Sequence, residues 1–244
     1  MFDQITAKLL LELARQSYFD EPKARAGVEA LALGDVRFVD KIGTQALVCG
    51  DGERLFLAFR GTDPDPRDWI TDGRFNPVPG ELGGRVHSGF RAALDAVWPE
   101  LSDMVANRGE RVVWVTGHSL GAALATLAAA RIVESGGEVA GVYTFGQPRT
   151  GLSDFRSAYD AKLKNITFRV VNHIDLVTRV PLLIQGYRHI GRMVYFDHDA
   201  KMHVDASPWH VARDDIRYRL THFGRIEAIG TAPHLIGPYR RLLA

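Results

Sequence analysis

The sequence predicts an α/β fold with a mostly parallel central sheet and helices on both faces. Short apolar runs alternate with segments of helical periodicity along the chain, and strands separated by helices favour parallel pairing. In residues 112–121, a run of β-branched and aromatic residues ends in Gly-x-Ser-x-Gly. An Ala- and Leu-rich stretch without Gly or Pro follows over 122–134, so a strand, a tight turn and a helix are expected here.

The size and composition of the chain favour one domain over residues 1–244. The net charge is +1 with both signs interspersed, which gives no field that would attract nucleic acid. Cys49 is the only cysteine, so an intramolecular disulfide and a cysteine-based metal site are both excluded. We expect Cys49 to be a buried thiol in a strand, and we expect no metal ion and no cofactor. No apolar run approaches the length of a membrane span.

The first part of the chain predicts a helix followed by three strands. Residues 2–18 place apolar side chains at helical spacing between charged ones, which indicates an amphipathic helix rather than a signal peptide. Residues 18–27 are polar and contain proline, and we interpret them as a connection. Gly and Asp at 50–52 favour a turn between two arms of a hairpin. The expected strands cover residues 36–39, 45–49 and 55–59.

A long loop separates these strands from the next helix. Residues 63–84 are dense in Pro, Gly and Asp, and loops of this length are commonly lids or binding loops. A short apolar patch, Trp69-Ile70, lies within it. The helix after the loop is expected to extend to about residue 107, with Pro99 kinking or splitting it.

The second half of the chain continues the alternation of strands and helices. Ser135-Gly136-Gly137 ends the helix that follows the Gly-x-Ser-x-Gly turn. A further helix is expected to reach about residue 164. The mixed pattern from 197 to 221 predicts no particular element. The strands expected here cover residues 139–145, 166–171 and 190–196.

Ser119 lies at the apex of the Gly-x-Ser-x-Gly turn and is the candidate nucleophile. Gly117 and Gly121 are expected because a Cβ at either position would clash where strand and helix close on each other. A serine hydroxyl is a weak nucleophile unless a histidine takes its proton and a carboxylate orients that histidine. The alternative is a glycine-bounded turn in which Ser119 only caps the helix.

The acid should follow Ser119 in the chain, because this strand–turn–helix arrangement places its partners in the order acid, then histidine. The carboxyl ends of parallel strands line such sites, and Asp175 directly follows the strand expected over 166–171. Asp154 fits a helix cap better and Asp160 lies within a helix, so we predict Asp175 as the acid. A turn-forming role for Asp175 is the alternative.

The base must lie after Asp175, and several histidines qualify by their order in the chain. A histidine on a loop after the last strand is favoured, and most of these histidines satisfy that condition. The residues alone therefore leave the base open. The candidates are His189, His198, His203, His210, His222 and His234.

Five ordered motifs carry a resemblance to a known family. They are Phe59-Arg60-Gly61-Thr62, Val86-His87-Ser88-Gly89-Phe90, Gly117-His118-Ser119-Leu120-Gly121, Tyr143-Thr144-Phe145-Gly146-Gln147-Pro148-Arg149-Thr150-Gly151 and Val171-Asn172-His173-Ile174-Asp175-Leu176-Val177-Thr178-Arg179-Val180-Pro181. From about residue 55 to 182 the chain resembles the class 3 lipases, the fungal-type triacylglycerol lipases and their bacterial and plant relatives. The resemblance implies an α/β-hydrolase fold with a short lid.

The same resemblance implies a catalytic triad of Ser119, Asp175 and His234. The family's nucleophile motif matches at Ser119, and its Asn-x-x-Asp-x-Val motif matches at Asp175. The family's histidine often precedes a tyrosine by several residues near the C-terminus, as His234 precedes Tyr239. His222 is the runner-up for the base.

The resemblance also implies an oxyanion hole and a lid. The backbone N–H groups of Leu120 and Thr62 would hold the oxyanion. The lid is expected over residues 63–76, and because this stretch is rich in charged side chains we expect weak activation at a lipid interface. The expected substrate-binding and lid residues are Trp69, Ile70 and His118.

These features predict a carboxylic ester hydrolase of the triacylglycerol lipase type, which cleaves acylglycerols or related lipid esters through a Ser-His-Asp acyl-enzyme mechanism. Phospholipase A1 or acyltransferase chemistry on the same triad is the alternative. The set of catalytic residue types disfavours a binding module with a degenerate site, and the resemblance disfavours a peptidase. The expected partners are a lipid or other carboxylic ester substrate and a transient lipid interface, without nucleic acid or a transmembrane segment. Location stays open between the cytoplasm and secretion without a visible signal peptide.

Overall fold

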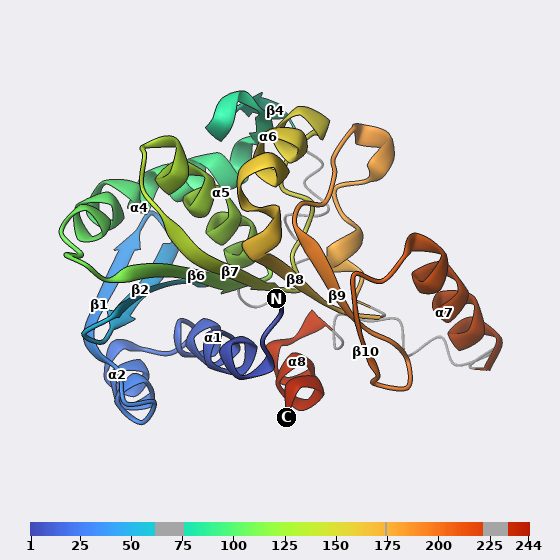
Figure 1. Cartoon of the computed structure of the whole chain (residues 1–244), viewed down its shortest axis with the longest axis horizontal. Helices are drawn as coiled ribbons and strands as arrows, with labels where there is room; N and C mark the ends of the chain where they lie inside the picture. The colour runs from blue at the N-terminus through green and yellow to red at the C-terminus, as the bar shows by residue number, and fades with distance from the viewer. Residues whose placement is uncertain (62–75, 174, 222–233) are drawn as a thin grey trace.

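An eight-stranded sheet organises the part of the chain that this computed structural model describes, residues 1–61, 76–173, 175–221 and 234–244 (Figure 1). Its strand order is β1-β2-β3-β6-β7-β8-β9-β10. Neighbours from β3 to β9 pair in parallel, whereas β1, β2 and β3 pair antiparallel, as do β9 and β10. The predicted mostly parallel sheet is therefore confirmed. The strands are β1 (Gly34–Lys41), β2 (Thr44–Gly50), β3 (Arg54–Phe59), β6 (Val112–His118), β7 (Val139–Phe145), β8 (Thr167–Asn172), β9 (Arg192–Phe196) and β10 (Met202–Val204), with a separate pair β4 (Pro77–Pro79) and β5 (Arg85–His87).

Helices cover both faces of this sheet, as predicted (Figure 1). α1, α2 and α8 lie on one face, and α4, α5 and α6 lie on the other. Within the described ranges, no helix is long and apolar enough to cross a membrane. The helices are α1 (Gln4–Gln16), α2 (Glu21–Glu29), α4 (Ser88–Ala106), α5 (Leu120–Glu134), α6 (Ser153–Leu163), α7 (Pro208–Thr221) and α8 (Ile236–Leu243).

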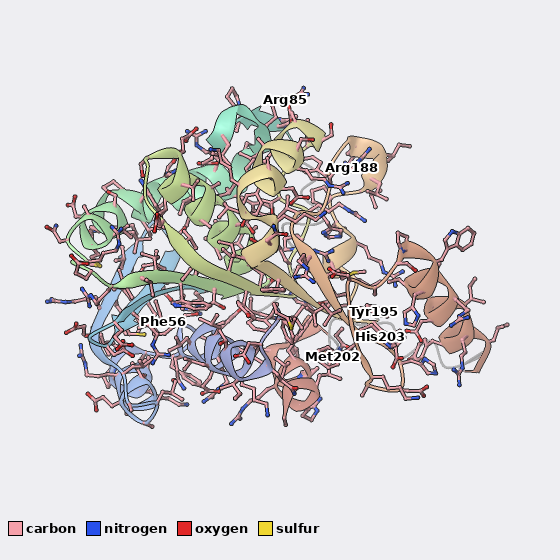
Figure 2. All side chains as sticks on the ribbon, in the orientation of Figure 1. Phe56, Arg85, Arg188, Tyr195, Met202 and His203 are labelled. Carbon is pink, nitrogen blue, oxygen red and sulfur yellow. The ribbon has the colours of Figure 1, made fainter. Side chains whose placement is uncertain are left out.

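The central strands are buried on both faces, which explains their nearly continuous apolar sequences. On β3, Leu57 packs into the core that contains Phe90 of α4, while its neighbour Phe56 packs into the core that contains Leu10 of α1 (Figure 2). Adjacent residues of a strand point to opposite faces, so one strand supplies both cores. The sheet thereby holds the carboxyl ends of its parallel strands in fixed relative positions.

One local prediction is wrong, and one of the two alternatives given for Pro99 is excluded. Residues 18–27, interpreted as a connection, contain most of α2, whose cap Asp20 accepts a hydrogen bond from the Lys23 N–H at 3.1 Å. Pro22 lies in the first turn, where its missing N–H removes no intrahelical bond, so it is compatible with the helix. Pro99 does not split α4, which runs from Ser88 to Ala106.

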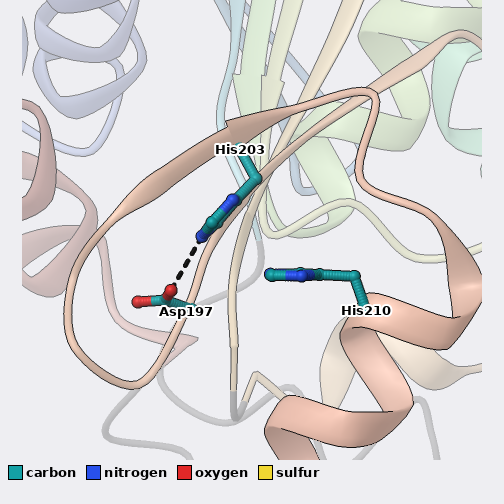
Figure 3. A group of neighbouring side chains, drawn as sticks. All are labelled: Asp197, His203 and His210. Atoms are coloured by element: carbon teal, nitrogen blue, oxygen red, sulfur yellow. Dashed lines mark hydrogen bonds and ion pairs between the residues drawn. The ribbon is translucent and has the colours of Figure 1, made fainter.

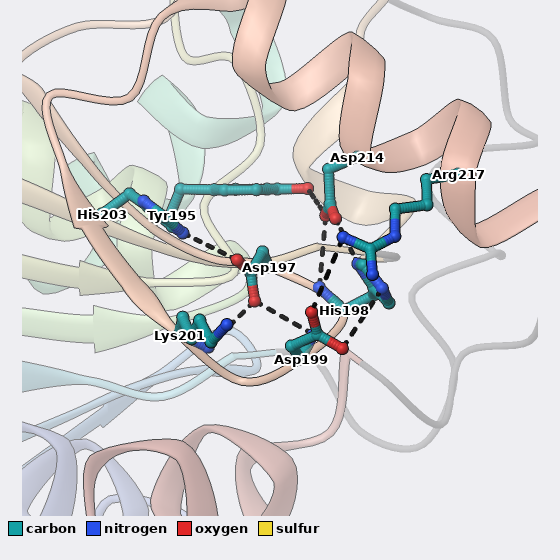
Figure 4. Close-up of polar contacts among 8 residues, drawn as sticks. All are labelled: Tyr195, Asp197, His198, Asp199, Lys201, His203, Asp214 and Arg217. Carbon is teal, nitrogen blue, oxygen red and sulfur yellow. Dashed lines mark hydrogen bonds and ion pairs between the residues drawn. The ribbon is translucent and has the colours of Figure 1, made fainter.

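Polar contacts dock α7 onto the hairpin of β9 and β10 (Figure 4). The Asp214 carboxylate accepts hydrogen bonds from the Tyr195 hydroxyl at 2.7 Å and from the His198 backbone N–H at 3.2 Å. Within the hairpin, the His203 ring bonds the Asp197 carboxylate at 2.7 Å. Because these contacts are polar, this part of the sequence lacks the apolar periodicity from which an element is predicted.

His87 ends β5 and caps α4. Its Nδ1 accepts hydrogen bonds from the backbone N–H groups of Gly89 at 3.1 Å and Phe90 at 3.4 Å. Its ring also stacks on the Phe90 ring, with the centroids 4.2 Å apart. Burial lowers the pKa of His87 to about 4. The imidazole is therefore neutral in the folded protein at neutral pH.

This cap makes stability depend on pH. The pKa of His87 is lower in the folded state than the ordinary value of about 6.5, so the unfolded state binds more protons and stability falls as pH drops from about 6.5 towards 4. His87→Asn keeps a capping side chain but does not titrate. We expect the variant to lose less stability on acidification, by about 1.4 kcal/mol for each pH unit below 6.5.

Urea denaturation of both proteins between pH 7 and 4.5 measures this difference. The other buried histidines remain in both proteins, so their contributions cancel in the comparison. Parallel stability–pH curves for wild type and variant would show that His87 does not contribute.

Candidate active site

Ser119 lies at a sharp turn between β6 and α5, as predicted. Its backbone is strained, with φ 59° and ψ −128°, a conformation that residues with a Cβ rarely adopt. A Cβ on Gly117 would lie 2.2 Å from the Gly121 carbonyl oxygen, and one on Gly121 would lie 2.1 Å from the Phe59 carbonyl oxygen. Both glycines are therefore required by the close approach of strand, helix and β3, which confirms the expectation from the motif.

Asp175 and His234 form a buried pair, with relative exposures of 0% and 2%. Nδ1 of His234 lies 3.0 Å from Oδ1 and 2.9 Å from Oδ2 of Asp175. Because a carboxylate only accepts hydrogen bonds, this contact assigns the proton to Nδ1 and leaves the lone pair of a neutral ring on Nε2. Asp154, the rival acid, instead lies in the first turn of α6 and pairs with Arg85 at 2.7 Å.

Three further donors hold Asp175. The Val177 backbone N–H donates to Oδ1 at 2.9 Å, and the Tyr239 hydroxyl donates to Oδ2 at 2.5 Å. The Thr178 hydroxyl donates to the Asp175 carbonyl at 2.8 Å, which fixes the backbone of the same turn. Burial, followed by the negative charge of Asp175, raises the pKa of Tyr239 well above its ordinary value. Tyr239 therefore keeps its proton and remains a donor.

His118 holds His234 from the other side. Its Nε2 lies 2.6 Å from the His234 carbonyl oxygen, and its Nδ1 lies 2.8 Å from the Tyr18 hydroxyl. The two imidazoles also stack, with centroids 4.7 Å apart. Burial lowers the pKa of His118 to about 3, and the charge of His234 acts in the same direction, so His118 stays neutral. His118 was expected among the substrate-binding residues, and in the ligand-free structure both its ring nitrogens are engaged within the protein.

The two atoms that a proton relay must join are both buried and free. Within the described part of the chain, neither Ser119 Oγ nor His234 Nε2 has a hydrogen-bond partner. The stacking of His118, the neighbour of Ser119, on His234 brings the two segments together. Hydrogen bonds between such groups are often long or poorly aligned in ligand-free sites and tighten when substrate binds.

Gly146 is a site residue that the sequence analysis treated only as part of a turn. Its φ is +61°, and a Cβ there would lie 2.9 Å from Asp175 Oδ2 and 2.9 Å from His234 Nδ1. A side chain at this position would push the acid and the histidine apart. The signal available in the sequence was the Gly-Gln-Pro turn directly after a strand, which marks a sheet end without revealing what packs against it.

The expected oxyanion donors are only partly described. Leu120 is the first residue of α5, so its N–H belongs to the first turn, where N–H groups have no partner within the helix. A Cβ on Gly61 would lie 3.0 Å from Ser119 Cβ, so the end of β3 approaches the nucleophile closely. The other expected residues lie outside the described ranges: Thr62, Trp69, Ile70, residues 63–75 of the lid, and His222.

One group of side chains among the described residues could hold a metal ion, and it is separate from the triad (Figure 3). Asp197, His203 and His210 place their ligand atoms within 4.8 Å of one another. A tetrahedral zinc site with bonds of about 2.0–2.1 Å needs ligand atoms roughly 3.4 Å apart. As arranged, Asp197 bonds the His203 ring, and the group is a polar contact between the hairpin and α7.

Comparison with known proteins points to the same family as the sequence motifs do. The sequence pattern of a family described as Lipase (class 3) matches residues 56–185. A secreted mono- and diacylglycerol lipase of Fusarium solani is 35% identical over 166 residues, which cover 64% of this chain and 49% of that protein. A lipase of Rhizomucor miehei is 35% identical over 160 residues, which cover 61% of this chain and 44% of that protein. The chain thus spans about half the length of the curated relatives it matches.

A solved structure extends the similarity beyond the matched sequence. The structure of a Rhizomucor miehei triacylglyceride lipase superposes with a TM-score of 0.68 at 26% identity. The superposition covers 82% of this chain and 82% of that one. The likeness therefore includes strands and helices on both sides of the segment that the sequence pattern matches.

The hydroxyl of Tyr239 provides a test of the buried network. Tyr239→Phe removes the donor to Asp175 and the acceptor of the Asn172 N–H, which lies 3.2 Å away. We expect the free energy of unfolding to fall by about 1–3 kcal/mol, because buried polar groups lose partners. Urea denaturation measures it. Tyr143→Phe, which removes a part-buried hydroxyl that accepts one hydrogen bond, from the Asp3 N–H at 3.3 Å, is the control. Equal stability of Tyr239→Phe and wild type would contradict the assignment.

Proposed function

The chain belongs to the class 3 lipase family, and we propose that it is a serine ester hydrolase that cleaves acylglycerols or related lipid esters. Its fold is that of the α/β-hydrolases. The observation that carries the proposal is a strained, buried serine whose neighbour His118 stacks on His234, a histidine whose Nδ1 is fixed by a buried carboxylate.

In the proposed mechanism, Ser119 Oγ attacks the ester carbonyl while His234 Nε2 takes its proton. The tetrahedral intermediate expels the alcohol, which receives that proton, and leaves an acyl group on Ser119. Water then attacks the acyl-enzyme with His234 again as base, which releases the carboxylic acid and restores the serine. Asp175 keeps the imidazole in the required tautomer and stabilises the imidazolium that forms.

We assign the oxyanion hole to the N–H groups of Leu120 and Thr62. Leu120 supports this role because it begins α5, whose N-terminal dipole favours a developing negative charge. Thr62 is proposed from the family resemblance, and its neighbour Gly61 supports it because that residue lies against Ser119. Losing one such donor typically raises the barrier by about 3–4 kcal/mol.

The substrate class is proposed from the relatives. Their names include mono- and diacylglycerol lipase and triacylglycerol lipase. Phospholipase A1 or acyltransferase chemistry would use the same triad with a different headgroup pocket or acceptor, and the relatives' names favour the acylglycerol reading. Because several relatives are described as secreted, we favour secretion for this protein over a cytoplasmic location.

We expect Ser119→Ala to lower kcat/KM for p-nitrophenyl esters by about 10³-fold or more, because the attacking hydroxyl is gone. Ser119→Ala combined with His234→Ala should lose little beyond the single variants, since the triad acts as a unit. Ser102→Ala, an exposed serine on α4, is the matched control and should retain activity. Near-normal activity of Ser119→Ala would refute the mechanism, and additive losses in the double variant would implicate another base.

The composition of the expected lid predicts weak interfacial activation. Residues 63–76 contain four aspartates and two arginines but few large apolar side chains, so they offer little surface for insertion into lipid. Initial rates on a short-chain triglyceride, measured through its solubility limit, should rise smoothly. A sharp jump in rate at the limit would contradict this expectation.

A further inference from the structure

Two buried arginines near the acid turn have no counter-ion among the residues that the structure describes. Arg149 follows β7 and Arg169 lies on β8, with relative exposures of 8% and 5%. Neither forms an ion pair with a carboxylate of the described residues, and the Nε atom of each lacks a hydrogen-bond partner there. Arg149 Nη1 donates to the carbonyl groups of Arg179 and Pro181. These carbonyl contacts leave the positive charge of the pair uncompensated.

Such an arrangement is costly unless something compensates the charge. Removing a charged group from water without a partner costs several kcal/mol, and two like charges in one buried region repel each other. Burial, followed by the charge of Arg149, lowers the pKa of Arg169 to about 10, so it stays charged at neutral pH. Burial and both arginines hold the pKa of half-buried His189 well below its ordinary value. The region therefore has a net positive charge, and no described carboxylate pairs with Arg149 or Arg169.

The two arginines line a pocket of about 530 Å³, a volume typical of small-molecule sites. One carboxylate, Asp215, also lines it, but that group already pairs with Arg179 at 3.0 Å. Tyr195 lines it too, and its hydroxyl donates to Asp214 of α7 at 2.7 Å (Figure 4). Most of the wall is apolar, formed by Val171, Leu183, Met193 and Val211.

We propose that this pocket binds the carboxylate of an alkyl-chain acid, with the carboxylate on Arg149 and Arg169 and the chain along the apolar wall. A guanidinium matches a carboxylate with two parallel hydrogen bonds, and binding in a low-dielectric site strengthens them. An anion without an alkyl chain would make no contact with the apolar wall, so that surface would contribute nothing to binding. We identify the ligand as the acid released by ester hydrolysis, and this identification rests on the proposed function. The existence of an anion site does not depend on that function.

The pocket adjoins the acid turn but is distinct from the triad. Thr178 lines the pocket and donates its hydroxyl to the Asp175 carbonyl. Arg149 bonds the carbonyl of Arg179, the residue after Thr178. An acid bound there would contact the segment that holds Asp175 without occupying the space between Ser119 and His234.

Isothermal titration of the full chain with sodium octanoate, below its micelle concentration, tests the proposal. Octan-1-ol tests the contribution of the charge, and inorganic phosphate tests the contribution of the chain. We expect octanoate to bind at least about tenfold more tightly than either, a difference of about 1.4 kcal/mol. Equal binding of octanoate and octanol, or of octanoate and phosphate, would overturn the proposal.

Two variants separate this pocket from any binding at the triad. Arg169→Met removes an uncompensated buried charge, so it should fold with equal or greater stability and bind octanoate at least about tenfold more weakly. Ala212→Glu places a negative charge on an exposed α7 position that lines the pocket, and Ala212→Gln is its neutral control. Weaker binding in Arg169→Met and Ala212→Glu but not in Ala212→Gln supports the site; unchanged binding in the first two would overturn it.

The binding of octanoate can be measured independently of catalysis. Ser119→Ala should bind octanoate as the wild type does, because Ser119 is not part of the pocket. A wild-type protein without esterase activity that still binds octanoate would refute the proposed function and leave this site standing. If the protein is an active esterase and Arg169→Met binds octanoate as tightly as the wild type, the proposed site is refuted and the proposed function is not.

Discussion

The burial of one carboxylate is the constraint on which the rest of this site depends. Asp175 is fully inaccessible to solvent and pairs with no lysine or arginine among the described residues, so hydrogen-bond donors must compensate its charge. Those donors come from separate parts of the chain: the next turn supplies Val177, α8 supplies Tyr239, and the segment before α8 supplies His234. The order of the parallel strands and the docking of α8 are thus tied to the geometry of the acid and the histidine.

The sequence could predict the parts of the site that are local or limited by chain order. Gly117, Ser119 and Gly121 sit within one strand–turn–helix unit, and Asp175 follows a predictable strand. His234 required the family resemblance, because several histidines satisfied the same order. The contacts of Tyr18 and Gly146 could not be predicted, since each depends on which segments the folded sheet brings together. Likewise α7 was missed because polar pairs through Asp214 hold it, and such pairs leave no apolar period in the sequence.

Charge compensation also distinguishes the two polar regions at this end of the sheet. Around Asp175 the buried negative charge is met by donors on every side, and neutral His118 adds a second layer that holds the His234 backbone. Around Arg169 the buried positive charge has no ion-pair partner within the described chain, and its Nε lacks a hydrogen-bond acceptor there. In the first region the buried charge has its hydrogen-bond donors within the protein, whereas the second has the electrostatics of the ligand site that we propose. Both share the turn that contains Thr178.

Covalent labelling with an active-site-directed organophosphonate, followed by peptide mass spectrometry, identifies both the nucleophile and the histidine that activates it. The account predicts one label per chain, located on Ser119, with labelling slowed severely in His234→Ala and left unchanged in His222→Ala. A label on another serine, or labelling that depends on His222 and not on His234, would contradict it.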